Sequence, residues 1–233
     1  MEYIQISKIF LVGDGLFYVI FLVCGFIAGY FLDTAASILE YTNEPSLKSS
    51  NPTPSYIHPH DVKIEVLTSL LLCANYFHFH LGIGTLNGII LSFLLIVISI
   101  VDLDIRIIPN LIIFPFTIIG LLLNIIRFFP HWWKPLSFSF GAFLFMLIIH
   151  FIYPKGMGMG DVKLALMIGS YLTTYTVIAL PLGFLIFSIY GLVLIIMRKA
   201  GLKDAVPFAP FVSLGSLIAL FWGDYILKWY ISF

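Results

Sequence analysis

The stretch Val66–Val101, VLTSLLLCANYFHFHLGIGTLNGIILSFLLIVISIV, decides the fold, because none of its 36 residues is Asp, Glu, Lys or Arg. At about 1.5 Å of rise per residue, a single helix of this length would exceed the roughly 30 Å hydrocarbon core of a bilayer. The stretch contains its own break at His78–His80, which is followed by Gly82 and Gly84. It therefore predicts two transmembrane helices rather than one.

The rest of the chain shows the same pattern. Leu164–Met197 has 34 residues without these four residue types, with a Thr-rich break at Thr173–Thr176. Four further uncharged stretches each have about the ~20 residues that one helical crossing needs. They are Gly15–Leu32, Ile107–Ile126, Pro135–Pro154 and Ala205–Gly223. Of the 233 residues 61% are hydrophobic and only 10% are charged, far fewer than in soluble domains. We predict an all-α polytopic membrane protein with about eight transmembrane helices, forming a single integral-membrane domain over residues 1–233.

Eight crossings would divide the basic residues unequally between two faces. One face would hold four of them: Lys8, Arg127, Lys134 and Lys228. The other would hold eight: Lys48, Lys63, Arg106, Lys155, Lys163, Arg198, Lys199 and Lys203. Cytoplasmic loops carry the excess of Lys and Arg, so we expect the second face to be cytoplasmic and both termini to face outward. The segment 33–63 would then be a short, irregular cytoplasmic loop.

Composition argues against several other functions. The net charge is zero, which gives no reason to expect nucleic-acid binding. Cys24 and Cys73 fall in apolar stretches without a CxxC pair, and His58 and His60 offer few ligands in an irregular loop. We therefore expect neither a disulfide nor a metal site. No pattern in the sequence fixes an oligomeric state.

Two acidic segments stand at the ends of predicted helices. Ser99–Asn110 (SIVDLDIRIIPN) contains Asp102 and Asp104, and Lys155–Lys163 (KGMGMGDVK) contains Asp161. An ionisable residue within or beside a membrane-spanning helix is costly to bury, which makes it a candidate functional group. Two predicted crossings separate Asp102 from Asp161, and an even number returns the chain to the same face. We therefore expect the two carboxylates to meet at the cytoplasmic boundary of the membrane.

Paired carboxylates favour one kind of chemistry. Two carboxylates that share a site do not ionise together readily, so the pair holds one proton between them. The ionised member can accept a proton from water that attacks a peptide carbonyl, while the protonated member supports the developing oxyanion. This reaction needs neither a metal nor a cofactor. Asp102 and Asp161 are therefore the candidate catalytic pair.

The neighbours of the two aspartates have less specific roles. Gly156, Gly158 and Gly160 are expected to allow an extended substrate strand to approach closely. Asp104 is a candidate for motif support, or one member of an ordinary juxtamembrane ion pair. Lys163 is a candidate for motif support or a cytoplasmic anchor. His150 is expected to be a packed histidine rather than a proton relay.

These segments resemble a known family. Ile100–Asp104 followed by Ile108–Asn110 is similar to the first catalytic motif of bacterial type IV prepilin peptidases, in which D-x-D precedes a proline-containing turn. Gly156–Ala165 (GMGMGDVKLA) is similar to their second motif, GMGxGDxKL. Val206–Phe211 and Phe221–Asp224 resemble C-terminal segments of the same family.

The resemblance implies a membrane aspartic endopeptidase of the bacterial inner membrane with Asp102 and Asp161 as its catalytic residues. The residues that support the motifs or contact the substrate would be Gly158, Gly160, Asp104 and Lys163. The partners would be membrane lipid and prepilins, or the pseudopilins of type II secretion, whose basic leader would be cut at the cytoplasmic face. Many members carry a cysteine zinc module between their first two helices, whereas 33–63 has no cysteine, as in a short form. Proteolysis would need no cofactor, and S-adenosylmethionine would be needed only if the family's N-methyltransferase activity is retained.

Other interpretations use the same carboxylates. Presenilin-like proteases also contain GxGD, but their aspartates lie nearer mid-membrane, whereas Asp102 is at a predicted helix end beside Arg106. A proton- or solute-coupled transporter could use Asp102 and Asp161 as binding groups, although no inverted repeat is visible and both aspartates are expected at one face. An inactive assembly scaffold would tolerate the loss of both.

Overall fold

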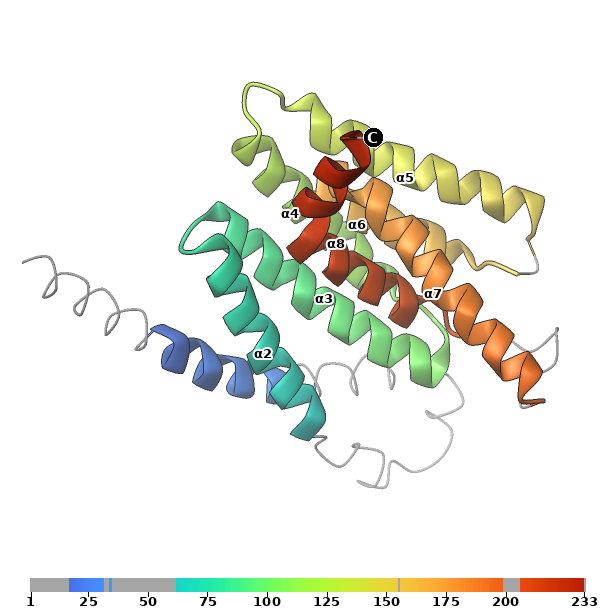
Figure 1. The fold of residues 1–233 in the computed structure, drawn as a ribbon, viewed down its shortest axis with the longest axis horizontal. Coiled ribbons are helices and arrows are strands. Elements are labelled where there is room, and N and C mark those ends of the chain that lie inside the picture. Colours follow the sequence, from blue (N-terminus) through green and yellow to red (C-terminus); the bar gives the residue numbers. More distant parts are fainter. Residues whose placement is uncertain (1–16, 32–33, 35–61, 155, 199–205, 233) are drawn as a thin grey trace, which may run out of the picture.

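The computed structural model describes residues 17–31, 34, 62–154, 156–198 and 206–232, and these residues form a helical bundle (Figure 1). The predicted cytoplasmic loop of 33–63 lies almost entirely outside the described residues. The helices are Phe17–Phe31, α2 (Val62–Phe79), α3 (Ile83–Ile105), α4 (Asn110–Arg127), α5 (Trp133–Ile152), α6 (Met159–Leu172), α7 (Thr176–Ile196) and α8 (Ala209–Ile231).

Each predicted stretch contains one or two helices, and both long stretches break at the predicted places, while the count of eight transmembrane crossings stays a prediction. His80 has φ 52°, and the chain turns there between α2 and α3. A short 3-10 helix, η3 (Thr173–Tyr175), separates α6 from α7. Among the described residues, five helical segments are long and apolar enough to cross a membrane, with Met159–Ile196 counted as one of them. The chain is thus an all-α, multi-pass membrane protein.

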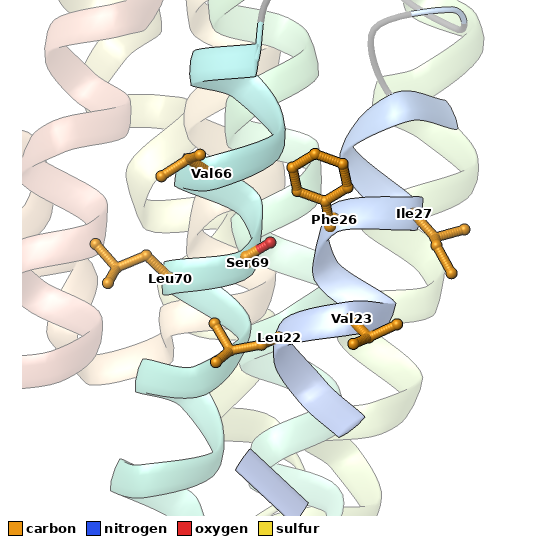
Figure 2. A pocket seen from close by; sticks show the side chains of 7 residues that line it. All are labelled: Leu22, Val23, Phe26, Ile27, Val66, Ser69 and Leu70. Carbon is orange, nitrogen blue, oxygen red and sulfur yellow. The ribbon is translucent and has the colours of Figure 1, made fainter. Parts of the chain in front are cut away.

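The middle of the bundle is built around α6 and α8. Helices α4 and α5 pack against α6, α3 and α7 pack against α8, and α2 packs against α3. Phe17–Phe31 lies at the edge of the bundle beside α2 (Figure 1). An apolar groove between these two helices has no ionisable side chain in its lining (Figure 2). The groove is lined by Leu22, Val23, Phe26, Ile27, Val66, Ser69 and Leu70.

Small residues bring the central helices close together. A Cβ atom added at Gly169 of α6 would lie 2.6 Å from the Ser139 Cα of α5. The Ser139 hydroxyl uses this proximity to donate a hydrogen bond to the Leu166 carbonyl at 2.7 Å. Between α7 and α8, a Cβ added at Gly215 would lie 2.5 Å from the Gly183 nitrogen. Helices in lipid gain little from hydrophobic burial against each other, so such close backbone packing is a main source of their association.

Two buried asparagines donate hydrogen bonds to the backbone carbonyls at the break between α6 and η3. The last carbonyls of a helix have no partner within it, and in hydrocarbon they have no water either. The Asn124 amide of α4 donates to the carbonyls of Ser170 at 2.9 Å and Tyr171 at 3.2 Å. The Asn87 amide of α3 also donates to the Tyr171 carbonyl, at 3.1 Å, and its oxygen accepts from Asn124 at 2.8 Å. These contacts tie α3 and α4 to the end of α6.

Candidate active site

A cavity of about 1190 Å³ lies at one end of the bundle, where α3 and α5 end and where α4, α6 and α8 begin (Figure 1). Both candidate catalytic residues, Asp102 and Asp161, contribute to its lining. The cavity also reaches Phe184 and Phe187 in the middle of α7. It thus joins a polar end, where helices terminate, to an aromatic wall between the helices.

Asp102 lies in the last turn of α3 and is only 5% exposed. Its Oδ2 accepts a hydrogen bond of 2.9 Å from the backbone N–H of Ala209, the first residue of α8. The first N–H groups of a helix have no partner within the helix, and the helix dipole favours negative charge beside them. The start of α8 therefore holds the Asp102 carboxylate in place from a distant part of the chain.

Asp161 lies in the first turn of α6 and is half-buried. Its Oδ2 accepts a hydrogen bond of 3.1 Å from the backbone N–H of Gly158, the residue that caps the helix. This is one half of a capping box, since glycine has no side chain to form the other half. Both aspartates are thus held in the same way, each by a backbone N–H at the start of a helix.

The two carboxylates are close enough for the charge of Asp102 to act on Asp161. The guanidinium of Arg106 lies within electrostatic range of Asp102, and His150 lies within range of Asp161. Backbone N–H groups can orient a carboxylate but cannot exchange protons with it on the reaction timescale. An arrangement of this kind can bind one proton between the carboxylates and activate a water molecule in the cavity.

The chain between α3 and α4 brings the two sequence segments into contact. Arg106 adopts the left-handed conformation with φ 54° and ψ 33°, and its N–H returns to the Asp102 carbonyl at 3.1 Å. The turn directs Ile108 against α6, where a Cβ added at Gly160 would lie 3.2 Å from the Ile108 Cβ. Gly160 therefore makes room for this internal contact. The sequence predicts that this glycine leaves room for a substrate strand, and in the structure Ile108 lies in the space beside Gly160.

The other predicted motif residues differ in their placement. Lys163 donates a hydrogen bond of 2.9 Å to the Asn110 side chain, and its ammonium lies 5.6 Å from the centre of the Phe114 ring. It thus ties the start of α6 to the start of α4. Gly158 lines the cavity. Asp104 is exposed and is not among the lining residues, because residues two apart on a helix point to opposite sides.

The structure adds residues that the sequence did not single out. His150 lies beside the second motif, with its Nδ1 2.8 Å from the Met157 carbonyl oxygen. Phe208 caps α8 and packs against Phe184 and Phe187 at ring distances of 5.1 and 5.3 Å. The resemblance of Val206–Phe211 to a C-terminal segment of the family pointed to this part of the chain, but it did not indicate what Phe208 does. Nothing in the sequence distinguished His150 from a packed histidine.

Metal ligands do not cluster in this part of the protein. Within the described ranges, no three His, Cys, Asp or Glu side chains are arranged to hold a metal ion. His58 and His60 lie outside those ranges. Cys24 and Cys73 are both free thiols in this structure.

Fold and site together define a class: a multi-pass helical membrane protein with two carboxylates in one cavity. Residues 89–196 match the Type IV leader peptidase family. The family predicted from the two aspartate motifs is thus confirmed.

Curated relatives agree with the family. The chain is 30% identical to the prepilin leader peptidase/N-methyltransferase of Aeromonas salmonicida (strain A449) over 175 residues. This alignment covers 72% of this chain and 60% of the relative. The protein of the same name from Legionella pneumophila is 31% identical over 176 residues, with 73% and 61% covered. The one from Bacillus subtilis (strain 168) is 28% identical over 186 residues, with 79% and 74% covered. The chain therefore spans about 60% of the length of the first of these relatives. No solved structure matches it.

Proposed function

We propose that this chain is a membrane aspartic endopeptidase that removes the basic leader from type IV prepilins or from pseudopilins of type II secretion. The observation that carries the proposal is the meeting of Asp102 and Asp161 in one cavity, each held by the N–H at the start of a helix. The names of the relatives supply the substrate class. The proposed domain is a single integral-membrane unit over residues 1–233.

The mechanism follows from one shared proton. The ionised carboxylate takes a proton from a cavity water as its oxygen attacks the scissile carbonyl, and the protonated carboxylate donates its proton to the carbonyl oxygen. The tetrahedral intermediate then collapses. The carboxylate that received the water proton passes it to the leaving amine, and one hydroxyl of the intermediate returns its proton to the other carboxylate, which restores the shared proton. Asp102 and Asp161 are each bound through Oδ2, so we assign proton transfer to the Oδ1 atoms. No metal, cofactor or covalent intermediate takes part in these steps.

The proposed orientation places the cavity at the cytoplasmic face of the bacterial inner membrane, with eight crossings in total. Arg106 and Lys163, which line the cavity, belong to the face with the excess of basic residues, and that excess marks cytoplasmic loops. A basic leader in the cytoplasm, followed by an apolar helix in the bilayer, would reach the cavity at the boundary where its two parts meet. The names of the relatives also include an N-methyltransferase, and our proposal covers the peptidase step alone.

Cleavage of a prepilin in membranes that contain this protein tests the proposal. We expect wild-type protein to cut the leader, and Asp102→Asn or Asp161→Asn to lower the rate by at least about 1000-fold, because asparagine cannot carry the shared proton. Asp224→Asn is the matched control, since Asp224 lies near the far end of α8 and should be replaceable without loss of cleavage. Wild-type rates in either active-site variant would overturn the assignment. Failure of wild-type protein on several prepilins would favour the transporter.

A further inference from the structure

His150 lies in the last turn of α5 and contacts the segment that leads from α5 to α6. Its Nδ1 is 2.8 Å from the carbonyl oxygen of Met157. A backbone carbonyl only accepts hydrogen bonds, so Nδ1 must carry the proton and donate it. The imidazole therefore fixes the position of one peptide group, seven residues further along the chain.

That peptide group is also the one that binds Asp161. The carbonyl of Met157 and the N–H of Gly158 belong to the same planar unit, and in a trans peptide they point in opposite directions. The N–H donates to the Asp161 Oδ2 at 3.1 Å. With His150 on the carbonyl side and Asp161 on the N–H side, the orientation of this plane is set from both ends. Hydrogen bonds in such a chain also polarise each other, which strengthens both.

The other backbone hydrogen bonds found among the described residues of the connecting segment do not involve this peptide group. Its own backbone contributes a turn from the Gly156 N–H to the Tyr153 carbonyl at 3.1 Å, which does not involve the Met157–Gly158 peptide. The Asp161 N–H returns to the Gly158 carbonyl at 3.2 Å, which belongs to the next peptide group. Within the described residues, the hydrogen bonds that restrain rotation of the Met157–Gly158 peptide thus come from His150 and from the carboxylate that the peptide orients, and the buried Met157 side chain adds packing on one side.

We propose that His150 is a positioning residue for Asp161, acting by orienting the Met157–Gly158 peptide so that its N–H holds the carboxylate. The role rests on the proposed peptidase function, in which Asp161 must face both Asp102 and the attacking water. His150 itself does not touch the reacting atoms. Its imidazole is close enough to Asp161 for their charges to interact, in agreement with this placement.

Three variants separate positioning from packing. His150→Leu keeps much of the side-chain volume and removes the donor. His150→Asn keeps a donor N–H one atom beyond Cγ, where Nδ1 stands in histidine, and removes the ring. His131→Leu makes the same chemical change in an exposed residue just before the other end of α5, and serves as the matched control.

Cleavage kinetics provide the first measurement. We expect His150→Leu to lower kcat by about 10- to 100-fold, as a displacement of the catalytic group near 1 Å would, with KM close to that of the wild type. His150→Asn should recover most of kcat, and His131→Leu should match the wild type. Equal losses in the Leu and Asn variants would show that ring packing is what matters and would overturn the proposal. So would a wild-type kcat in His150→Leu.

The Gly158 amide provides a second measurement that needs no cleavage. Labelling with ¹⁵N-glycine in detergent micelles gives at most 18 resonances, and loss of one in Gly158→Ala assigns Gly158. In the wild type this amide proton should lie downfield, as expected for a bond to a carboxylate, and Asp161→Asn should move it upfield. His150→Leu should produce a similar upfield shift, and His150→Asn should reverse most of it. An unchanged resonance in His150→Leu would overturn the proposal, whereas failure of the wild type to cleave would overturn only the peptidase function.

Discussion

The two ends of the helical bundle both contain aspartates, but they use different partners. At the cavity end, Asp102 and Asp161 accept hydrogen bonds from backbone N–H groups. At the opposite end, Asp224 of α8 accepts a hydrogen bond of 2.6 Å from the Tyr175 hydroxyl. The first arrangement places two carboxylates in the lining of one cavity. The second uses a carboxylate to join α8 to η3. The hydrogen-bond partner thus separates the candidate catalytic aspartates from a structural one, whereas the residue type does not.

After the two asparagine variants described above, the largest effect is expected from Asp102→Glu, which we compare with Asp224→Glu at the opposite end. Asp102→Glu adds one methylene to a side chain that is 5% exposed, which displaces the carboxylate from Ala209 and Asp161. We expect the rate of prepilin cleavage to fall by about 100-fold, although the charge is kept. Asp224→Glu, at an exposed position, should leave cleavage unchanged. Equal rates of prepilin cleavage in Asp102→Glu and Asp224→Glu would contradict the proposal that only the aspartates at the cavity end take part in catalysis.

A second test addresses the region between the two ends. Asn124→Leu removes the donor that serves the carbonyls of Ser170 and Tyr171. The Ser170 carbonyl then loses its donor, and the Tyr171 carbonyl keeps only the bond from Asn87. This should cost about 2 kcal/mol of stability, seen as a lower Tm of the detergent-solubilised protein. Thr117→Val on the same helix is the control, because the Thr117 hydroxyl bonds only to the Ile113 carbonyl of its own helix at 2.7 Å. If cleavage per folded molecule fell as far in Asn124→Leu as in Asp102→Glu, Asn124 would act in catalysis and not only in stabilising the fold.

Tyr175→Phe tests only the end of the bundle that lies opposite the cavity. Removing the hydroxyl breaks the bond to Asp224 and should lower stability by about 1 kcal/mol, measured as a shift in Tm. Cleavage should not change, because the contact joins helices far from the cavity. Tyr190→Phe is the control, since the Tyr190 ring packs against Phe211 at 4.8 Å and this contact survives loss of the hydroxyl. A larger loss of cleavage than of stability would contradict the structural role of this end.

The smallest effect concerns the contact between the two motifs. Lys163→Met removes the hydrogen bond to Asn110 and the ammonium that lies over the Phe114 ring, and it keeps an unbranched apolar side chain. The side chain is partly exposed, and exposed polar contacts contribute little, so we expect a decrease in cleavage of only about threefold. Lys134→Met, at the other end of the bundle, should cause none. A loss of 100-fold or more would show that Lys163 contacts the substrate rather than α4.

Much of the fold could be predicted, because lipid imposes simple constraints on sequence. The 36-residue stretch Val66–Val101 is too long for one crossing, and it breaks at the histidines and glycines that it contains. The Thr-rich break after α6 was also predicted. Its physical cause could not be, because the amides that bind the freed carbonyls come from Asn87 and Asn124 on other helices. Polar contacts between distant helices leave no periodic signal in the sequence.

The site was predicted less completely than the fold. The motifs indicated Asp102 and Asp161, and counting crossings indicated that they would share a face. Their roles stay predictions, as does the role of Asp104. The backbone donors could not be predicted, since every residue except proline has an N–H and only the tertiary structure brings that of Ala209 to Asp102. His150 was missed for the same reason, because its partner is a carbonyl rather than a side chain.

The origin of the Asp102 hydrogen bond has a consequence for the synthesis of the protein. The donor, Ala209, is 107 residues downstream of Asp102, so α3 to α7 leave the ribosome before the donor exists. A nascent chain at that stage already carries both aspartates and can insert them into the membrane. It lacks the segment that positions Asp102 until α8 docks against α3. For the proposed peptidase, this order of assembly would keep partly translated chains from cutting their neighbours in the membrane.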